Sequence, residues 1–525
     1  MERKLTYTDL LGLQEVTHIG DDLLLLPEQA SVPYEEARAL VNAGIIPQSE
    51  SVINTAAWKI IELGEEYASE GGYKRPGGEP AWVKDYPINV RTHLRFDYAV
   101  RHEDALFIVP SFMPRKHNQD EFNAQPTFAA GISYMVLQDG LCQETYGAFG
   151  LWRLEYIKQL GFLNAPPYNT LAHMRQSLSE STRFLHSLDV YAIATVMGHN
   201  LGLSRSQINT LGVLALTHDV RTPAGGDSVK LVAPGELDED KTYHLTLEKV
   251  DLSALESEYE VRREWLLEGI LNKGLLGEIL DVADKLAYIA RDISKCLHHI
   301  EAGTRHDHPG LNTLLDILAQ FPYVASVWDS VAVSEDGHLY FTDVRRLLAF
   351  LKVRVLMFRE LYYEPSTRFG EFFISRLFVK MLYDKGELTR DMLLEMNDIQ
   401  LMQLLDARFG DYNVLDRCSS EVARVESFAT LKQARAFARK LKKKGKHFVM
   451  IDDYRRAIKS GVRFLVQTPE GPKPLSEAEP GNARELEEMA TMLPLVHVYY
   501  LEDNPALPSH VLKELIEYVE SPAAR

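Results

Sequence analysis

The feature that most restricts how this chain can fold is a set of two histidines and two aspartates placed in or beside apolar runs. His186 lies inside one run, the pair His218–Asp219 follows Leu211–Leu216 after Thr217, and Asp284 lies on a third. Apolar runs of this kind predict buried helices. A buried imidazole or carboxylate is costly without a partner, and a metal ion is a partner for both. We therefore predict that the four side chains meet at one divalent ion (Mn, Mg, Fe, Zn or Co).

Each of these residues, taken alone, has an explanation that needs no metal ion. A lone histidine on an apolar helix, such as His186, is more often a satisfied core residue. Asp219 could likewise cap a neighbouring segment. The order of the four residues and their helical context favour the metal site over these separate explanations.

The third run carries a second pattern. Asp284, Tyr288 and Asp292 are spaced four residues apart and therefore lie along one helical face, with Lys285 beside them. The alternative is a surface face held by an ion pair between Asp281 and Lys285, which is a frequent arrangement. Because Asp284 follows a His-Asp pair, we favour a site in which all three side chains face a ligand.

Composition limits the class of protein. The 525 residues are 46% hydrophobic, which is enough for a large core and two or three domains. The net charge of -18 disfavours general nucleic-acid binding. The three cysteines are far apart, so we expect no disulfide framework and a reducing, cytoplasmic location. We also expect no secretory leader and no membrane span.

The pattern along the chain predicts a mainly α fold in three parts. Residues 1–150 form a mixed α/β region with a strand at Ala105–Val109, and their role is not assigned. Residues 151–420 form the helical metal-binding core, beginning with a helix at Arg153–Gly161. Within this core, the acidic residues 231–258 are expected to form a surface excursion. Residues 421–525 form a small α+β domain with a basic helix at Leu431–Lys444 and a last helix at Ser509–Val519.

Four motifs in order resemble one known family. They are Arg153-Leu154…Lys158-Gln159-Leu160-Gly161, Arg183-Phe184-x-His186-Ser187, His218-Asp219, and Asp284-Lys285-x-x-Tyr288-x-x-Arg291-Asp292. This set resembles the HD-domain metal-dependent phosphohydrolases and, among them, the deoxynucleoside triphosphate triphosphohydrolases. The similarity runs through residues 150–410. It implies an HD-type helical core and a divalent metal bound by His186, His218, Asp219 and Asp284.

The resemblance also implies residues that bind a nucleotide substrate. Arg183 and Lys285 would contact the phosphates, while Gln159, Tyr288 and Asp292 would surround the sugar. Two further positions, Arg354 and Tyr362, fall where the family has another phosphate-binding arginine and a sugar-packing tyrosine. Arg359 and Tyr363 compete for those two roles, and helix packing explains these residues equally well.

The sequence departs from the family directly after the His-Asp pair. Relatives usually carry a Gly-His-x-Pro-Phe-x-His loop, whereas this chain has Thr222 and Asp227 at the histidine positions. Asp227 is therefore our candidate for acid, base or second-metal ligand. His244, with Glu248, is the candidate for the family's later His-Glu pair. With Arg183, they form the predicted catalytic set.

These observations predict a metal-dependent phosphohydrolase. Attack on the α-phosphorus of a deoxynucleoside triphosphate would release nucleoside and tripolyphosphate, and a general acid must protonate the leaving oxygen. The altered loop keeps two alternatives open. One is a nucleoside monophosphatase or cyclic-nucleotide phosphodiesterase of the same fold, and the other is a nucleotide-binding regulator without turnover.

The strongest basic cluster lies at Lys440–Lys446. A solvated helix face is the usual explanation of such a cluster. A surface that binds a regulatory nucleotide or nucleic acid is the alternative, suggested by the family resemblance. The same resemblance suggests a homo-oligomer.

Overall fold

The computed structural model describes the chain in segments. They are residues 86–87, 95–102, 105–110, 140–159, 161, 182–298, 327, 330–358, 362–363, 368, 374–410, 423–453, 460–491, 496–501 and 508–520. Helices account for 63% of this part and strands for 11%, which confirms the mainly α fold with a small sheet component.

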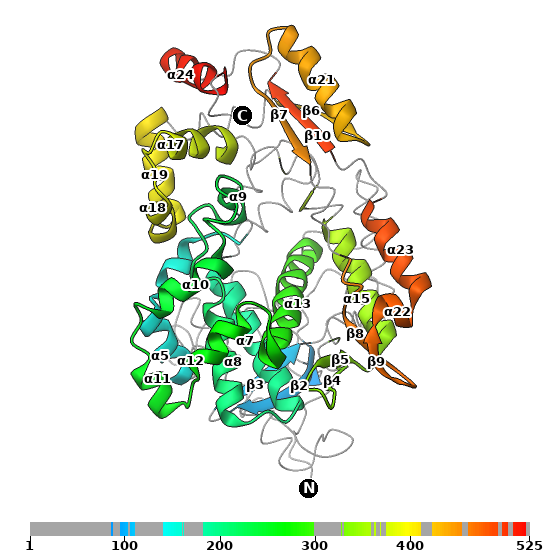
Figure 1. Cartoon of the computed structure of the whole chain (residues 1–525). Helices are drawn as coiled ribbons and strands as arrows, with labels where there is room; N and C mark the ends of the chain where they lie inside the picture. Colours follow the sequence, from blue (N-terminus) through cyan, green and yellow to red (C-terminus); the bar gives the residue numbers. More distant parts are fainter. Residues whose placement is uncertain are drawn as a thin grey trace, which may run out of the picture.

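A helical body forms the larger half of the described chain (Figure 1). Its elements are α5 (Gly140–Phe149), the 3-10 helix η3 (Leu151–Tyr156), α7 (Arg183–Asn200), α8 (Arg205–Thr217), α9 (Gly226–Lys230), α10 (Glu239–Leu247), α11 (Ser253–Glu258), α12 (Arg263–Gly269), α13 (Gly274–His298) and α15 (Val344–Met357). Helices α7, α8 and α13 pack against one another, and their apolar residues belong to one continuous core. Leu188, Leu214 and Leu286 are fully or almost fully buried in it.

Helix α8 illustrates why these segments are helical. Its apolar run begins after Ser204, whose hydroxyl accepts the Gln207 backbone N–H while the Gln207 side chain accepts the Ser204 N–H. This reciprocal cap satisfies two amide groups that the first turn leaves without a helical partner. The helix ends at Thr217, so the next residue, His218, lies at the C-terminal end of this buried helix.

Two predicted segments differ in the structure. Residues 231–258 are not a surface excursion, because α10 and α11 bury Tyr243, Leu247 and Leu255 in the main core. The predicted helix at Arg153–Gly161 is only the short helix η3, after which Ile157 is extended and Lys158 pairs with Thr182. In residues 231–258, the acidic composition hid the apolar residues that enter the core. After η3, the pairing of Lys158 with Thr182 prevails over helix propensity.

The later part of the chain adds helices and two sheets. The helices are η7 (a π-helix, Ile374–Val379), α17 (Lys380–Asp384), α18 (Arg390–Glu395), α19 (Asp398–Phe409), α21 (Leu431–Lys443), α22 (Leu475–Ala478), α23 (Pro480–Thr491) and α24 (Ser509–Glu520). One sheet has the order β6 (Ala423–Phe428), β10 (Val496–Leu501), β7 (Val449–Asp453), all antiparallel, with Val498 opposite both Glu426 and Ile451. The other has the order β4 (Val331–Val333), β5 (Leu339–Phe341), β8 (Leu465–Thr468), β9 (Gly471–Pro474). The basic and terminal helices predicted from the sequence are confirmed.

Contacts cross the predicted domain boundaries at residues 150 and 420, which stay predictions. Leu141 lies in the main core before the first boundary, and Val466, Leu475 and Leu486 lie in the same core after the second. Strand β8 joins β5 in parallel, through Phe341 and Val466. Residues after 421 therefore contribute both to a separate sheet under α21 and to the helical body.

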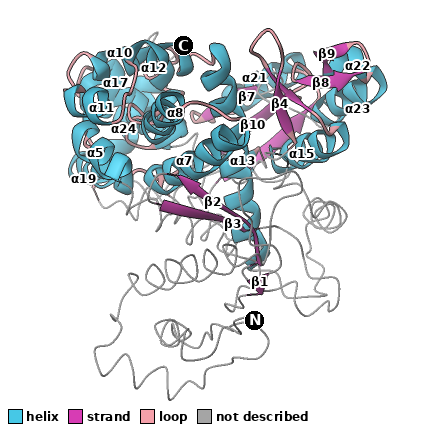
Figure 2. Cartoon of the chain, turned by 90° about the horizontal axis from the view of Figure 1, so that it is seen from below, coloured by secondary structure: helices cyan, strands magenta, loops and turns pink. Residues whose placement is uncertain are grey.

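A hairpin of β2 (Arg95–His102) and β3 (Ala105–Pro110) lies against α7, with the two-residue strand β1 (Tyr86–Pro87) beside β2 (Figure 2). The predicted strand at Ala105–Val109 is confirmed. Among the helices that the structure describes, none has the length and apolarity needed to cross a bilayer.

Glycines allow the backbone after η3 to lie against the backbone at the start of α9. Gly161 has φ 54°, and a Cβ placed on it would lie 2.2 Å from the Gly225 carbonyl oxygen. Gly226 has φ 58° and faces the Lys158 carbonyl and Gly161. Side chains are excluded here by both backbone angle and space. This contact fixes α9 next to Gln159.

Gly161→Ala should therefore destabilise the protein more than Gly202→Ala. Gly202 also has positive φ, 71°, but nothing lies within 4 Å of a Cβ there. The angle alone should reduce the free energy of unfolding by about 1–2 kcal/mol in both variants. The additional backbone clash should make Gly161→Ala clearly worse in denaturant unfolding. Equal losses would contradict the close contact.

Candidate metal centre and its pocket

His186 reaches the centre from the first turn of α7. The Arg183 N–H donates to the Ile157 carbonyl at 2.8 Å, and the His186 N–H donates to the Thr182 carbonyl at 3.1 Å. The extended residues after η3 thus fix where α7 begins. Arg183 and His186 lie three residues apart, so both point to the same side of the helix. Both are buried.

The turn after α8 holds His218 and Asp219. The buried Arg153 guanidinium donates to the carbonyls of Val220 and Thr222, at 2.8 Å each, and to that of Met396 at 3.0 Å. An arginine presents several donors in a fixed plane, so one side chain can brace three carbonyls. The glycine-containing segment 220–228 suggests a flexible loop from its sequence, but in the structure it is largely buried and hydrogen-bonded to α18 and α19.

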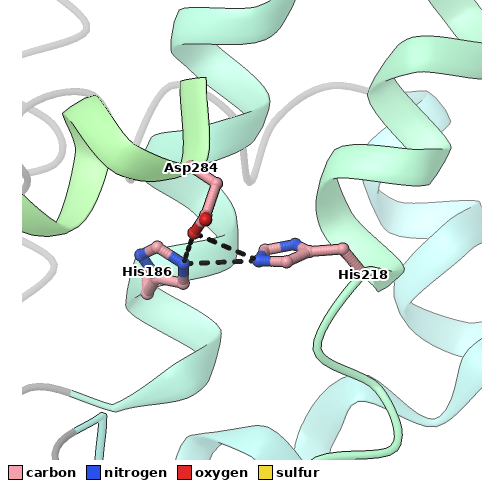
Figure 3. A group of neighbouring side chains, drawn as sticks. All are labelled: His186, His218 and Asp284. Carbon is pink, nitrogen blue, oxygen red and sulfur yellow. Dashed lines mark hydrogen bonds and ion pairs between the residues drawn. The ribbon is translucent and has the colours of Figure 1, made fainter. Parts of the chain in front are cut away.

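Three side chains from three helices or helix ends converge (Figure 3). His186 Nε2 lies 2.9 Å from Asp284 Oδ1 and 3.3 Å from His218 Nε2. His218 Nε2 lies 3.8 Å from Asp284 Oδ1. Donor atoms bound to one ion at about 2.0–2.2 Å have separations of this size. His186, His218 and Asp284 therefore form a group that can hold a metal ion.

The protonation of the two imidazoles fits that role. His218 Nδ1 lies 2.7 Å from the Ala215 carbonyl oxygen and so carries the proton, which leaves the Nε2 lone pair facing the group. Burial lowers the pKa of His186, although Asp284 and Asp219 partly offset it, and therefore favours the neutral, ligating form. Two nitrogens and a carboxylate oxygen suit Fe, Mn, Zn or Co.

Asp219 lies beside this group and is shared with Arg183. Its Oδ2 is 3.5 Å from His218 Nε2 and 3.8 Å from His186 Nε2, and it accepts the Arg183 Nη1 hydrogen bond at 2.9 Å. Oδ1 accepts from the Thr222 hydroxyl at 3.1 Å. Burial raises the pKa of Asp219, but the charge of Arg183 above all, together with the two neighbouring imidazoles, outweighs it and holds the pKa below its ordinary value. Asp219 is thus ionised and positioned next to the His186–His218–Asp284 group.

A chain of ion pairs leads away from the centre. Arg183 Nη2 lies 2.7 Å from Asp227 Oδ2, and Lys230 Nζ lies 2.7 Å from Asp227 Oδ1. Lys230 also pairs with Glu239 at the start of α10. Burial raises the pKa of Asp227, but Arg183 and Lys230 outweigh it and lower the pKa to about 2. For Glu239, burial dominates and raises the pKa. The two carboxylates therefore differ in their readiness to hold a proton.

These residues line a pocket of about 670 Å³, a size typical of small-molecule sites. Metal-centre residues, the Asp227 chain and four aromatic side chains from α13 and the segment after α15 surround it. A further part of its wall comes from Arg368, from η7 through Arg376, and from β7 through Ile451, Asp452 and Asp453. The pocket therefore extends from the candidate ligands to the sheet under α21.

The predicted substrate residues are divided by the structure. Gln159, Arg183, Tyr288 and Tyr362 line the pocket. Arg354 is buried behind it, and its Nε donates to the Tyr288 hydroxyl at 2.9 Å.

Lys285 and His244 are not among the lining residues. Lys285 Nζ pairs with Asp281 and lies over the Phe464 ring, 5.8 Å from its centroid, so the ion-pair alternative considered for this face is present. His244 is exposed on α10. The side chain of Asp292 lies outside the described residues.

Several lining residues escaped sequence analysis. Lys230, Glu239 and Asp240 follow the His-Asp pair, and Phe358 belongs to the aromatic wall. The spacing of Asp227 and Lys230, three residues apart, could have indicated their pairing on a short helix. Nothing local in the sequence indicates that Asp452 of β7 would reach the same pocket.

Comparison with known proteins shows the fold and no family. No family model matches this sequence, and no curated protein matches it. Among solved structures, a phosphohydrolase from Bacteroides thetaiotaomicron is 14% identical, with a TM-score of 0.51 over 69% of this chain and 95% of the other. A hypothetical protein from Aquifex aeolicus is 17% identical, with a TM-score of 0.49 over 73% and 96%. At 14% identity, the similarity to the phosphohydrolase establishes a shared fold.

The charge state of Asp219 predicts how acid affects metal-free protein. An unfolded aspartate has a pKa of about 3.9, whereas the folded Asp219 has a lower one, so the unfolded chain binds this proton first as pH falls. Its stabilising contribution is full above pH ~4 and is lost below it. Asp219→Asn should lower the free energy of unfolding by about 3 kcal/mol at pH 7, because Arg183 loses a buried partner.

In denaturant unfolding with a chelator present, the difference between Asp219→Asn and wild type should shrink as the pH falls from about 5 to 3. Glu470→Gln is a control on an exposed carboxylate. A difference that stays constant over this range would contradict the ionised, paired state of Asp219.

Proposed function

We propose that this protein is a metal-dependent phosphohydrolase and that its substrate is a nucleotide, with deoxynucleoside triphosphates as the first candidates. The observation that carries the proposal is the His186–His218–Asp284 group beside a pocket of about 670 Å³. The fold shared with a protein described as a phosphohydrolase supports the reaction class. When bound, a divalent ion would polarise a phosphoryl oxygen and activate water.

The aromatic wall supports a nucleoside rather than a bare phosphate. The Tyr288 ring packs edge-on against Phe358 and Tyr362, with centroids 6.3 Å away in each case. Phe358 also packs against Tyr363, 5.5 Å away. Such a cluster offers rigid apolar surface to a base or sugar, and Arg354 holds the Tyr288 hydroxyl in place. We assign these side chains to the nucleoside and Arg183 to a phosphate.

The charge balance of the pocket limits how a triphosphate would bind. Eight carboxylates line it (Asp219, Asp227, Glu239, Asp240, Asp281, Asp284, Asp452 and Asp453) against four arginine or lysine side chains (Arg183, Lys230, Arg368 and Arg376). A triphosphate carries about four negative charges. It would therefore enter as a complex with a divalent cation, in addition to an ion at the three-residue group. The same excess of acid favours a nucleoside monophosphate as the second candidate substrate.

The ion-pair chain suggests which group supplies the proton. Asp227 stays ionised at neutral pH and suits the positioning of water or a cation. Glu239 is the better proton donor, because burial keeps its proton bound to higher pH, and its Oε2 is buried with no hydrogen-bond partner among the described residues. The leaving ester oxygen needs such a donor. We assign the acid role to Glu239, a residue that sequence analysis did not select.

Removal of one imidazole should abolish metal binding and activity together. His186→Ala should release the ion, measured by elemental analysis, and reduce the hydrolysis rate by about a thousandfold or more, since such an ion supplies several kcal/mol of transition-state stabilisation. The matched control is His338→Ala, because His338 is exposed and pairs with Glu278. Both proteins are incubated with each dNTP and dNMP plus Mn²⁺ or Mg²⁺.

Products identify the substrate class. Nucleoside with tripolyphosphate supports triphosphohydrolase activity, whereas orthophosphate from dNMPs supports the monophosphatase alternative. Retained metal with no phosphate released from any nucleotide would contradict the proposed function.

Glu239→Gln tests the acid assignment against Asp227→Asn. Loss of a general acid should lower kcat by about 10²–10⁴-fold. Wild-type kcat should fall as the pH rises past the pKa of Glu239, because the ionised form donates no proton, and Glu239→Gln should lack this fall. Asp227→Asn should keep it. A pH profile unchanged in Glu239→Gln would exclude the residue as the acid.

A further inference from the structure

A second pocket adjoins the candidate metal-centre pocket at β7. Its volume is about 660 Å³, and its walls come from η7, α17, the end of α21, β7 and α24. Figure 1 shows α21, β7 and α24 gathered at one end of the molecule. Arg376 and Ile451 line both pockets, so the two share a wall.

Positive charge dominates this pocket. Arg376, Lys380, Lys442 and Lys446 line it together with His447, against the single carboxylate of Glu520. In the catalytic pocket, by contrast, carboxylates outnumber basic side chains. Four basic side chains around one cavity create a local positive potential there, even though the chain as a whole is acidic.

The charges are only partly neutralised by neighbours. Lys380 Nζ lies 2.9 Å from Asp384 Oδ1, and Glu520 is engaged by His447 at 3.0 Å. Within the part of the chain that the structure describes, no carboxylate lies within ion-pair distance of Lys442 or Lys446. Two lysines thus face a cavity whose one acid already has a partner.

We propose that this second pocket binds a compact polyanion with adjoining phosphate groups. Lysine ammonium groups recognise phosphate as point charges, and the neighbouring Arg376 adds to the positive charge of the cavity. A cavity of this size holds a small molecule and places four cations around it. The site sorts the basic cluster into Lys442 and Lys446, which face the pocket, and Lys440, Lys443 and Lys444, which do not line it.

A small ligand fits the pocket better than a nucleic-acid strand. Strand binding needs an extended basic groove with exposed aromatic rings on which bases stack. Here the cations converge on one cavity, Phe448 is buried, and the Tyr518 hydroxyl is bonded to Asp384. The net charge of -18 would also repel a long polyanion approaching the rest of the surface.

The test measures binding of inorganic tripolyphosphate by titration calorimetry, with a chelator present to suppress metal-dependent binding at the catalytic pocket. It therefore stands apart from the proposed hydrolysis. Wild type should bind one anion per chain. Lys442→Glu/Lys446→Glu should weaken binding by about tenfold or more, since each lysine makes a charge-assisted contact. Lys440→Glu/Lys443→Glu, an equal charge change on α21, should weaken it less than about twofold.

The milder Lys442→Gln/Lys446→Gln pair repeats the test if charge reversal alters the melting temperature. Absence of tripolyphosphate binding to wild type, or equal weakening in the two lysine pairs, would overturn the site. A labelled single-stranded oligonucleotide is titrated in parallel. Oligonucleotide binding that both pairs of substitutions abolish equally would overturn it in favour of a nucleic-acid surface.

Discussion

The structure depends on bringing two imidazoles and a carboxylate to within about 4 Å of one another in a largely buried place. His186 is 1% exposed at its side chain, and Asp284 is 36% exposed on the pocket side. The arrangement requires the first turn of α7, the C-terminal end of α8 and the middle of α13 to lie together. A cation shared by the three side chains would stabilise that packing, because it replaces the water that burial removes.

A series of ion pairs extends outward from the centre. Arg183 joins Asp219, next to the imidazoles, to Asp227, and Lys230 joins Asp227 to Glu239. The cations neutralise the carboxylates unequally, so Asp227 stays ionised while Glu239 retains its proton more readily. Two acids in one pocket can thus serve different purposes, a separation typical of hydrolytic sites. The difference in pKa between the two residues comes from their surroundings, because both are ordinary carboxylic acids.

The grouping of these side chains was predictable because the candidate ligands lie in or beside strong apolar runs, where an uncompensated polar residue is conspicuous. His186, His218 and Asp284 could be grouped for this reason, and the helical core around them followed from periodicity. Glu239 could not be found in this way, because its acidic surroundings in the sequence resemble an exposed loop. In the structure, Tyr243 anchors the same helix in the core. Nor could Asp452 be found in this way, because it reaches the pocket through long-range strand pairing. Local sequence patterns can locate candidate metal ligands. They cannot locate pocket residues that arrive through contacts between distant parts of the chain.

Anomalous diffraction from crystals grown with Mn²⁺ tests the central claim most directly. The account predicts one strong peak bonded at about 2.0–2.2 Å to His186 Nε2, His218 Nε2 and an Asp284 carboxylate oxygen. A protein saturated with Mn²⁺ that shows no peak among these three side chains, or a peak bound wholly elsewhere, would contradict it.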